Sequence, residues 1–154
     1  MRALIQRVSR CSIAIHNSVH SSIGQGMLIL LGVRSDDVPA DAEYLAVRSS
    51  NLRIFSDAEG KMNFSIDEVH GSAMVVSQFT LYADTRKGNR PSYTDSAPPE
   101  SAEKLYEHFL STLRSRLGAE RVAAGVFREM MKVELVNDGP VTVLLESKPH
   151  LSTE

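Results

Sequence analysis

Apolar and polar residues alternate along residues 1–15, which predicts a long β-strand with a bulge near Ser9-Arg10. The run Met27–Val33 is almost wholly apolar, a pattern typical of a central strand that is covered on both faces. A third apolar run begins at Met74 and continues to Tyr82. Shorter strands are predicted at residues 19–23, 52–55, 131–136 and 141–145, with a turn at 137–140.

Two segments show the period of an amphipathic helix instead. Residues 39–49 follow Ser35-Asp36-Asp37, which predicts a capped helix start with Pro39 in its first turn. A longer helix is predicted from Ser96 to Leu117. Together the elements predict one α+β domain: a curled, mostly antiparallel β-sheet or barrel with two main helices. We expect this domain to span residues 1–147 and to be followed by a flexible polar tail, residues 148–154.

The composition limits the cellular location and the partners that this domain can have. No apolar run approaches the roughly 20 residues of a membrane span, and the N-terminus lacks the continuous apolar core of a signal peptide. These features and the single cysteine, Cys11, which we expect to be buried and inert, favour a cytoplasmic protein with no membrane partner. The net charge of −2 means that any nucleic-acid contact requires a local basic patch. Arg86, Lys87 and Arg90 form one candidate, and the alternative is a solvated loop.

The usual catalytic signatures are missing from the sequence. The five histidines are scattered and have no cysteine or carboxylate company at the spacing of metal ligands, so no metal or other cofactor is expected. No phosphate loop, dinucleotide fingerprint or nucleophile elbow is present. If the protein is an enzyme, its chemistry is expected to depend on backbone donors, a strand-end hydroxyl or the substrate itself.

The apolar run at Met74 ends in the polar segment Ser77-Gln78-Phe79-Thr80. On a strand, Ser77 and Phe79 would face one side and Gln78 and Thr80 the other. A core strand that ends in hydroxyl and amide groups can form the floor of a small polar pocket. The alternative is local: Ser and Thr at strand ends commonly bond to the backbone of the next turn.

Three segments, taken in order, carry a resemblance to a known family. They are Ser77–Asp84, Arg90-Pro91-Ser92 and Leu135–Thr142, supported by matches at Gln6-Arg7-Val8, Arg53–Asp57 and Gly60–Asn63. Together they resemble the D-aminoacyl-tRNA deacylases of the bacterial and eukaryotic type, over residues 1 to about 145.

The resemblance implies a homodimeric editing hydrolase whose substrate is D-aminoacyl-tRNA and which needs no cofactor. It implies that Ser77, Gln78, Phe79 and Thr80 line the pocket for the aminoacyl group and the terminal adenosine. It also implies that Gly139-Pro140 is a cis pair, inserted into the partner's pocket, where it rejects L side chains. Arg7 would brace this pair. Met130, which precedes the last strands, is expected in the core or in a pocket wall, and the core is favoured. Without the resemblance, Asp-Gly-Pro predicts an ordinary turn with a trans peptide bond. Arg7 would then be expected to be a solvated cation on a strand.

The resemblance also indicates how the ester is cleaved. The resemblance implies that the 2′-hydroxyl of the terminal ribose, rather than a protein base, assists the reaction. The less favoured alternative is Thr80 as a nucleophile, because no base accompanies it in the sequence. Because a gate that rejects only L side chains cannot exclude glycine, some glycyl-tRNA hydrolysis is expected. Two other classes stay open: a non-catalytic dimeric nucleic-acid-binding module, and a metal- or side-chain-dependent hydrolase of small D-amino-acid esters.

Overall fold

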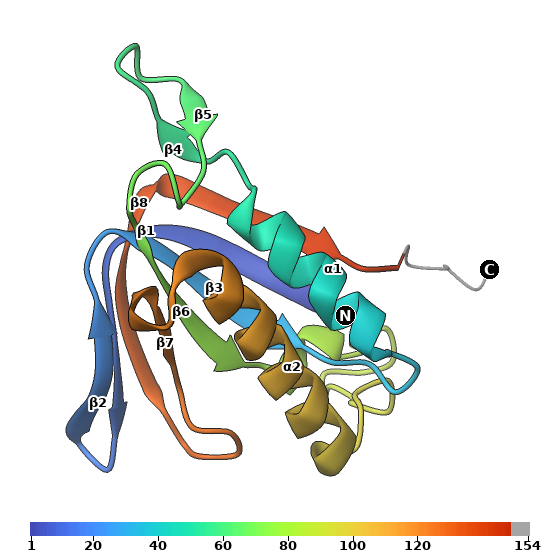
Figure 1. Ribbon diagram of the computed structural model, residues 1–154. Coiled ribbons are helices and arrows are strands. Elements are labelled where there is room, and N and C mark those ends of the chain that lie inside the picture. The colour runs from blue at the N-terminus through green and yellow to red at the C-terminus, as the bar shows by residue number, and fades with distance from the viewer. Residues whose placement is uncertain (149–154) are drawn as a thin grey trace.

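The computed structural model describes residues 1–148 and contains one large sheet packed against two helices (Figure 1). The strand β1 (Arg2–Ile15) lies at its centre and pairs antiparallel with three others. The strand order is β2-β1-β3-β6-β7, and β8 lies along β1. The strands β3, β6 and β7 are mutually parallel. The remaining elements are β2 (Ser18–Ile23), β3 (Gly26–Gly32), α1 (Pro39–Ser50), β4 (Phe55–Ser56), β5 (Met62–Phe64), β6 (Ser72–Ser77), the 3₁₀ turn η1 (Phe79–Tyr82), α2 (Pro99–Leu117), η2 (Ala119–Arg121), β7 (Val122–Ala124) and β8 (Lys132–Glu146).

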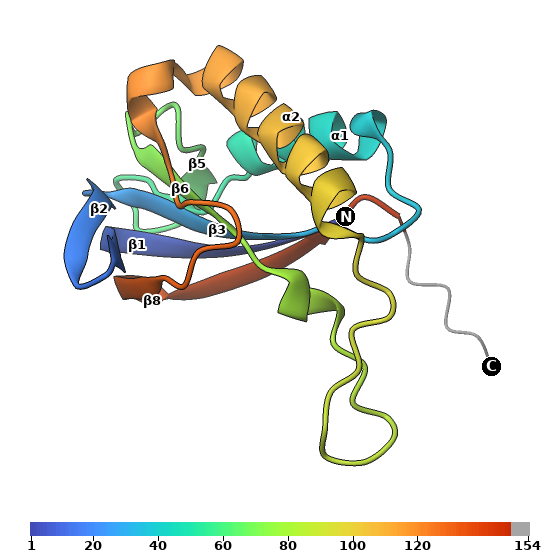
Figure 2. The same ribbon diagram turned by 90° about the horizontal axis from the view of Figure 1, so that it is seen from below.

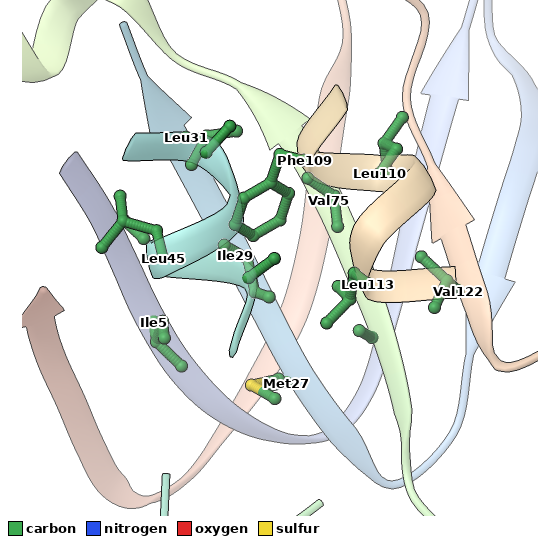
Figure 3. Close-up of a cluster of buried hydrophobic side chains, with 14 of the residues drawn as sticks. Ile5, Met27, Ile29, Leu31, Leu45, Val75, Phe109, Leu110, Leu113 and Val122 are labelled. Carbon is green, nitrogen blue, oxygen red and sulfur yellow. The ribbon is translucent and has the colours of Figure 1, made fainter. Parts of the chain in front are cut away.

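The main core lies between one face of the sheet and the two helices. Ile5, Ile29 and Val75 project from three neighbouring strands towards Leu45 of α1 and Phe109 of α2 (Figure 3). All five side chains are fully buried. Every second residue of these strands therefore lies in this core, where apolar burial is the main stabilising term.

The opposite face of the sheet curls around a second, smaller core. Cys11, Leu28 and Met74 belong to it, and burial raises the pKa of the Cys11 thiol to about 11. The hydroxyl of Ser21 donates a hydrogen bond of 3.1 Å to the Ala124 carbonyl, which joins β2 to β7 across the open side of the curl. The predicted curled α+β fold with two main helices is confirmed, as is the burial of Cys11.

One buried hydroxyl ties α2 to the sheet. Tyr106 is buried, and its hydroxyl donates a hydrogen bond of 3.0 Å to the Val75 carbonyl. We expect Tyr106→Phe to lower the free energy of unfolding by about 1 kcal/mol, the usual net value of such a bond, and the melting temperature by about 2–4 °C. Thermal unfolding followed by circular dichroism measures the shift. Tyr44→Phe, on the exposed side of α1, is the matched control and should leave the melting temperature unchanged.

Several predicted elements differ from the structure. Of the strand expected at residues 52–55, only Phe55 lies in a strand, β4. The strand expected to reach Tyr82 ends at Ser77, and the chain continues as the 3₁₀ turn η1. The turn expected at residues 137–140 is wrong as well, because β8 is one strand that follows β1 on both sides of a bulge. Between the pairs Gln6–Thr142 and Val8–Asn137, β8 has three more residues than β1. Long-range pairing with β1 therefore overrides the local turn preference of Asn-Asp-Gly-Pro.

The N-terminus and the last described residues meet beside α1. The Met1 ammonium donates hydrogen bonds of 2.6 Å to Asp37 Oδ1 and to Ser147 Oγ. Lys148 forms an ion pair of 3.1 Å with Asp41. Ser147 and Lys148 are therefore held against the domain, whereas the rest of the predicted tail, residues 149–154, lies outside the described residues. Within residues 1–148, no helix is both long enough and apolar enough to cross a membrane.

Candidate active site

A cleft of about 850 Å³ opens where β6 ends, beside the start of α2. Ser77, Gln78 and Phe79 line it, as does Met130. Met130 is 87% exposed, so its favoured assignment to the core is wrong. The other lining residues are mostly apolar or aromatic: Leu31, Val33, Val76, Tyr93, Ser96, Ala97, Pro98, Pro99, Ala102, Tyr106, Phe127, Arg128, Glu129, Met131 and Val133. A large apolar cleft with a few polar groups is typical of a small-ligand site. The change from strand to η1 brings three consecutive residues to the cleft, where a continued strand would present alternate ones.

The turn η1, which begins the cleft wall, is fixed from several directions. The backbone N–H of Gln78 donates a hydrogen bond of 2.8 Å to the Leu31 carbonyl. The hydroxyl of Ser96 donates one of 3.1 Å to the Phe79 carbonyl. Gly32 lies directly beneath, where a Cβ would come within 3.1 Å of both the Gln78 oxygen and the Leu81 Cβ. The backbone of η1 can therefore approach β3 closely only because position 32 has no side chain.

Arg2 is a further support for η1 that the sequence did not suggest. Its guanidinium donates hydrogen bonds of 2.8 Å to the Leu81 carbonyl and 2.7 Å to Glu146 Oε1. The same group lies 4.7 Å from the centroid of the Tyr82 ring. Burial raises the pKa of the Tyr82 hydroxyl well above its ordinary value. Only the pairing of β1 with β8, which places Arg2 opposite Glu146, brings these distant residues together.

The first amides of η1 are available to a ligand. Within residues 1–148, the N–H groups of Phe79 and Thr80 have no protein acceptor, as is usual for the first donors of a helical turn. The expectation that Thr80 lines the pocket is wrong for a single chain, because Thr80 is not among the residues that line the cleft. Its hydroxyl accepts a hydrogen bond from the side-chain amide of Gln78. Glu129 is the only carboxylate in the lining, which contains no histidine. Across the same described residues, no three His, Cys, Asp or Glu side chains are grouped to hold a metal ion.

Gly139 and Pro140 lie at the bulge of β8, joined by a cis peptide bond. The side chain of Arg7 is 12% exposed, and it donates hydrogen bonds of 2.8 Å to the Asp138 carbonyl and 2.7 Å to the Ile54 carbonyl. It is therefore a bracing side chain and not a solvated cation. Gly139 has a φ of +146°, and a Cβ there would lie 2.7 Å from Val141 Cγ2, so a larger residue would disturb the bulge.

Within one chain, the bulge and the cleft are far apart. Gly139 lies opposite Arg7, which pairs with Met27 of β3, which in turn pairs with Ala73 of β6. Ser77 lies four residues further along β6. Four residues along a strand and three strand spacings across the sheet correspond to roughly 20 Å. The two predicted parts of the site, the pocket residues and the Gly-Pro pair, are therefore not brought together by a single subunit.

The basic loop after η1 extends from the body of the domain (Figure 2). Asp84 and Ser92 pair at its base through backbone hydrogen bonds of 2.7 and 2.9 Å. Arg86 forms an ion pair of 2.8 Å with Asp84, and its hydrogen bonds hold the pKa of that carboxyl well below its usual range. Lys87 and Arg90 are exposed and form no ion pair within residues 1–148. The predicted three-cation patch thus has two uncompensated charges.

The fold and the strand-end cleft define a single-domain α+β protein with a small-ligand site supported mainly by backbone groups. The sequence profile of the D-Tyr-tRNA(Tyr) deacylase family matches residues 4–146, and the chain belongs to that family. A D-aminoacyl-tRNA deacylase of Roseiflexus castenholzii is 57% identical over 147 residues, covering 96% of this chain and 92% of the relative. A D-aminoacyl-tRNA deacylase of Anaeromyxobacter dehalogenans is 54% identical over 148 residues, which cover 96% of this chain and 98% of the relative.

Solved structures agree on the fold. One described as "c-Myc DNA Unwinding Element Binding Protein" superposes with a TM-score of 0.92 at 38% identity, covering 97% of this chain and 100% of that one. A second, described as a "probable eukaryotic D-amino acid tRNA deacylase", has a TM-score of 0.82 at 16% identity, covering 94% and 98%. At that identity the likeness concerns the fold alone.

Proposed function

We propose that the protein is an editing enzyme, a D-aminoacyl-tRNA deacylase that hydrolyses the ester between a D-amino acid and the 3′ end of tRNA. The observation that carries this proposal is the cleft at the end of β6, whose lining residue Phe79 and its neighbour Thr80 have backbone N–H groups with no acceptor within residues 1–148. Family membership supports the same substrate, since the closely related proteins described above are named D-aminoacyl-tRNA deacylases. Aminoacyl-tRNA is made and used in the cytoplasm, where we place the activity.

The chemistry needs few protein groups because an aminoacyl ester is already activated. A water adds to the ester carbonyl carbon, and the carbonyl oxygen becomes an oxyanion that accepts hydrogen bonds from the Phe79 and Thr80 N–H groups. When the tetrahedral intermediate collapses, the bond to the ribose 3′-oxygen breaks, giving the free D-amino acid and tRNA. A preorganised donor of this kind is commonly worth about 3–4 kcal/mol of transition-state stabilisation. The contacts of Arg2, Ser96 and Gly32 keep these donors in place.

We assign the proton transfer to the 2′-hydroxyl of the terminal ribose, which accepts a proton from the attacking water while its own proton passes to the departing 3′-oxygen. The alternative, Thr80 as nucleophile, requires a base beside its hydroxyl. The group that contacts this hydroxyl is the Gln78 amide, which is not a base in either orientation. Thr80 is therefore assigned an orienting role, in which its hydroxyl holds Gln78 and its backbone N–H contributes to the oxyanion site.

We further propose that two chains form a homodimer and that Gly139-Pro140 of the partner subunit completes each cleft. The roughly 20 Å between the bulge and the cleft of one chain supports this arrangement. The helix-free face of the sheet offers a surface for a second copy. Leu30, Leu4 and Leu144, which are partly or largely exposed, form a continuous apolar row across β3, β1 and β8. Leu144 at the end of this row is 49% exposed.

The basic loop is assigned to the phosphates of the acceptor end, which position a substrate without identifying bases. Arg90→Gln and Lys87→Gln should each reduce the slope of log K against log [salt] by about 0.7–0.9. Arg86→Gln should have a smaller effect, because Asp84 already neutralises that side chain. Binding of uncharged tRNA at several salt concentrations, measured by filter binding, tests the difference. Equal slopes for Arg86→Gln and Arg90→Gln would contradict the assignment.

The direct test is the release of labelled D-tyrosine from D-tyrosyl-tRNA under multiple turnover. We expect catalytic release by the wild-type protein. We expect none by Ala102→Trp, in which a large side chain fills the cleft. Salt-dependent tRNA binding without release would favour the nucleic-acid-binding module instead. Hydrolysis of free D-tyrosine esters at a comparable rate, or loss of activity with a chelator, would favour a small-ester hydrolase.

A further inference from the structure

Arg128, an exposed residue in the lining of the cleft, has an unusual backbone conformation. Its φ is +68°, in the left-handed region that residues other than glycine rarely adopt. Its side chain is exposed, lines the cleft, and has no ion-pair partner within residues 1–148. It is also the only cation in the cleft lining. A strained residue at a candidate site is a reason to look for a ligand contact there.

The volume and the lining of the cleft indicate which part of the substrate lies nearest to Arg128. A volume of about 850 Å³ is within the range of pockets that bury one drug-sized ligand, so the aminoacyl group and one nucleoside fill it. The walls that would contact these groups are aromatic or apolar, as at Phe79, Phe127 and Met130. The first anionic group beyond the terminal nucleoside is its own 5′-phosphate, and this group must lie where the cleft opens.

We propose that Arg128 binds the 5′-phosphate of the terminal nucleotide and so fixes the position of the substrate in the cleft. The inference rests on the proposed function and adds a phosphate contact separate from the basic loop, because Lys87 and Arg90 do not line the cleft. A guanidinium suits this role since it can donate two parallel hydrogen bonds to phosphate oxygens. Glu129, the adjacent carboxylate, is also exposed and weakens the local positive potential.

The test compares two non-hydrolysable amide analogues, 3′-deoxy-3′-(D-tyrosylamino)adenosine with and without a 5′-phosphate, by calorimetry. The wild-type protein should bind the phosphorylated analogue about fivefold more tightly. Arg128→Gln should lose this preference and bind the unphosphorylated analogue as before, whereas Arg128→Lys should keep most of it. Glu129→Gln should increase it. Arg48→Gln, an exposed arginine on α1, is the matched control and should leave the preference unchanged.

Arg128→Gly separates the charge from the backbone conformation. Glycine adopts a positive φ without strain, so this variant should unfold at no lower temperature than the wild type and still lose the phosphate preference. The proposal is overturned if Arg128→Gln retains the preference, or if it weakens both analogues equally. Because the analogues report binding without turnover, this outcome is distinct from failure of the proposed function, which would appear as absent release of D-tyrosine from D-tyrosyl-tRNA.

Discussion

D-tyrosyl-tRNA that ends in 2′-deoxyadenosine should be hydrolysed about a hundredfold more slowly than the natural substrate, or slower still. Proton transfer by a positioned group typically contributes 10²–10⁴-fold. The cleft has no histidine, and Glu129 is the only carboxylate in its lining. If the neighbouring ribose hydroxyl supplies this contribution, its removal eliminates the main proton-transfer group and leaves only the oxyanion donors.

The measurement is the single-turnover rate of release from the two substrates, which excludes differences in product dissociation. Thr80→Val is the matched protein variant, because it keeps the backbone N–H and the approximate volume but removes the hydroxyl. We expect it to retain activity within about tenfold, since it loses only the hydrogen bond with Gln78. A dead Thr80→Val variant together with an active 2′-deoxy substrate would reverse the assignment and make Thr80 the nucleophile. Glu129→Gln in the same assay tests whether the one carboxylate in the lining acts as a base.

The parts of the fold that depend on local pattern were predictable from the sequence. The alternation in β1 and the apolar run of β3 identify strands whose side chains occupy both cores. The bulge near Ser9-Arg10 also follows from this alternation, and the pairing of β1 with β8 shifts register there. The helix predicted at residues 39–49 lies at Pro39–Ser50, because its apolar period and its first-turn proline are local features.

Features set by distant partners were not predictable in the same way. Asn-Asp-Gly-Pro has the composition of a hairpin turn, and only the register of β1 against β8 turns it into a bulge within one strand. Arg2 and Leu81 are 79 positions apart, so the support of η1 by Arg2 has no local signature. The pairing of Arg86 with Asp84 differs, since two positions separate them and the sequence alone could have suggested a neutralised charge. The positive φ of Arg128 has no signature in its side-chain type.

Selection against L-amino acids is the harder requirement of the proposed site, and it should depend on the partner subunit. The wild-type protein should hydrolyse D-tyrosyl-tRNA and some glycyl-tRNA, and should leave L-tyrosyl-tRNA intact. An accommodating pocket discriminates weakly between such similar esters, so rejection requires a rigid block. Arg7 and the side chain of Asn137 hold the bulge through hydrogen bonds of 2.8 Å to the Asp138 carbonyl and 3.0 Å from the Val141 amide. Replacing Pro140 with alanine frees its φ, and we expect L-tyrosyl-tRNA hydrolysis to rise by about tenfold or more.

Mixed dimers decide which chain supplies the block. Pro140→Ala protein is combined with an excess of Ala102→Trp protein, whose own cleft is filled but whose bulge is intact. If the bulge acts across the interface, each open cleft receives an intact bulge, so L-tyrosyl-tRNA hydrolysis should disappear while D-tyrosyl-tRNA hydrolysis continues. If the bulge acts within its own chain, hydrolysis of the L substrate per Pro140→Ala chain should not change. Thermal unfolding and gel filtration of both variants verify that they fold and exchange subunits. An unchanged L rate in dimers shown to be mixed would exclude the cross-subunit arrangement.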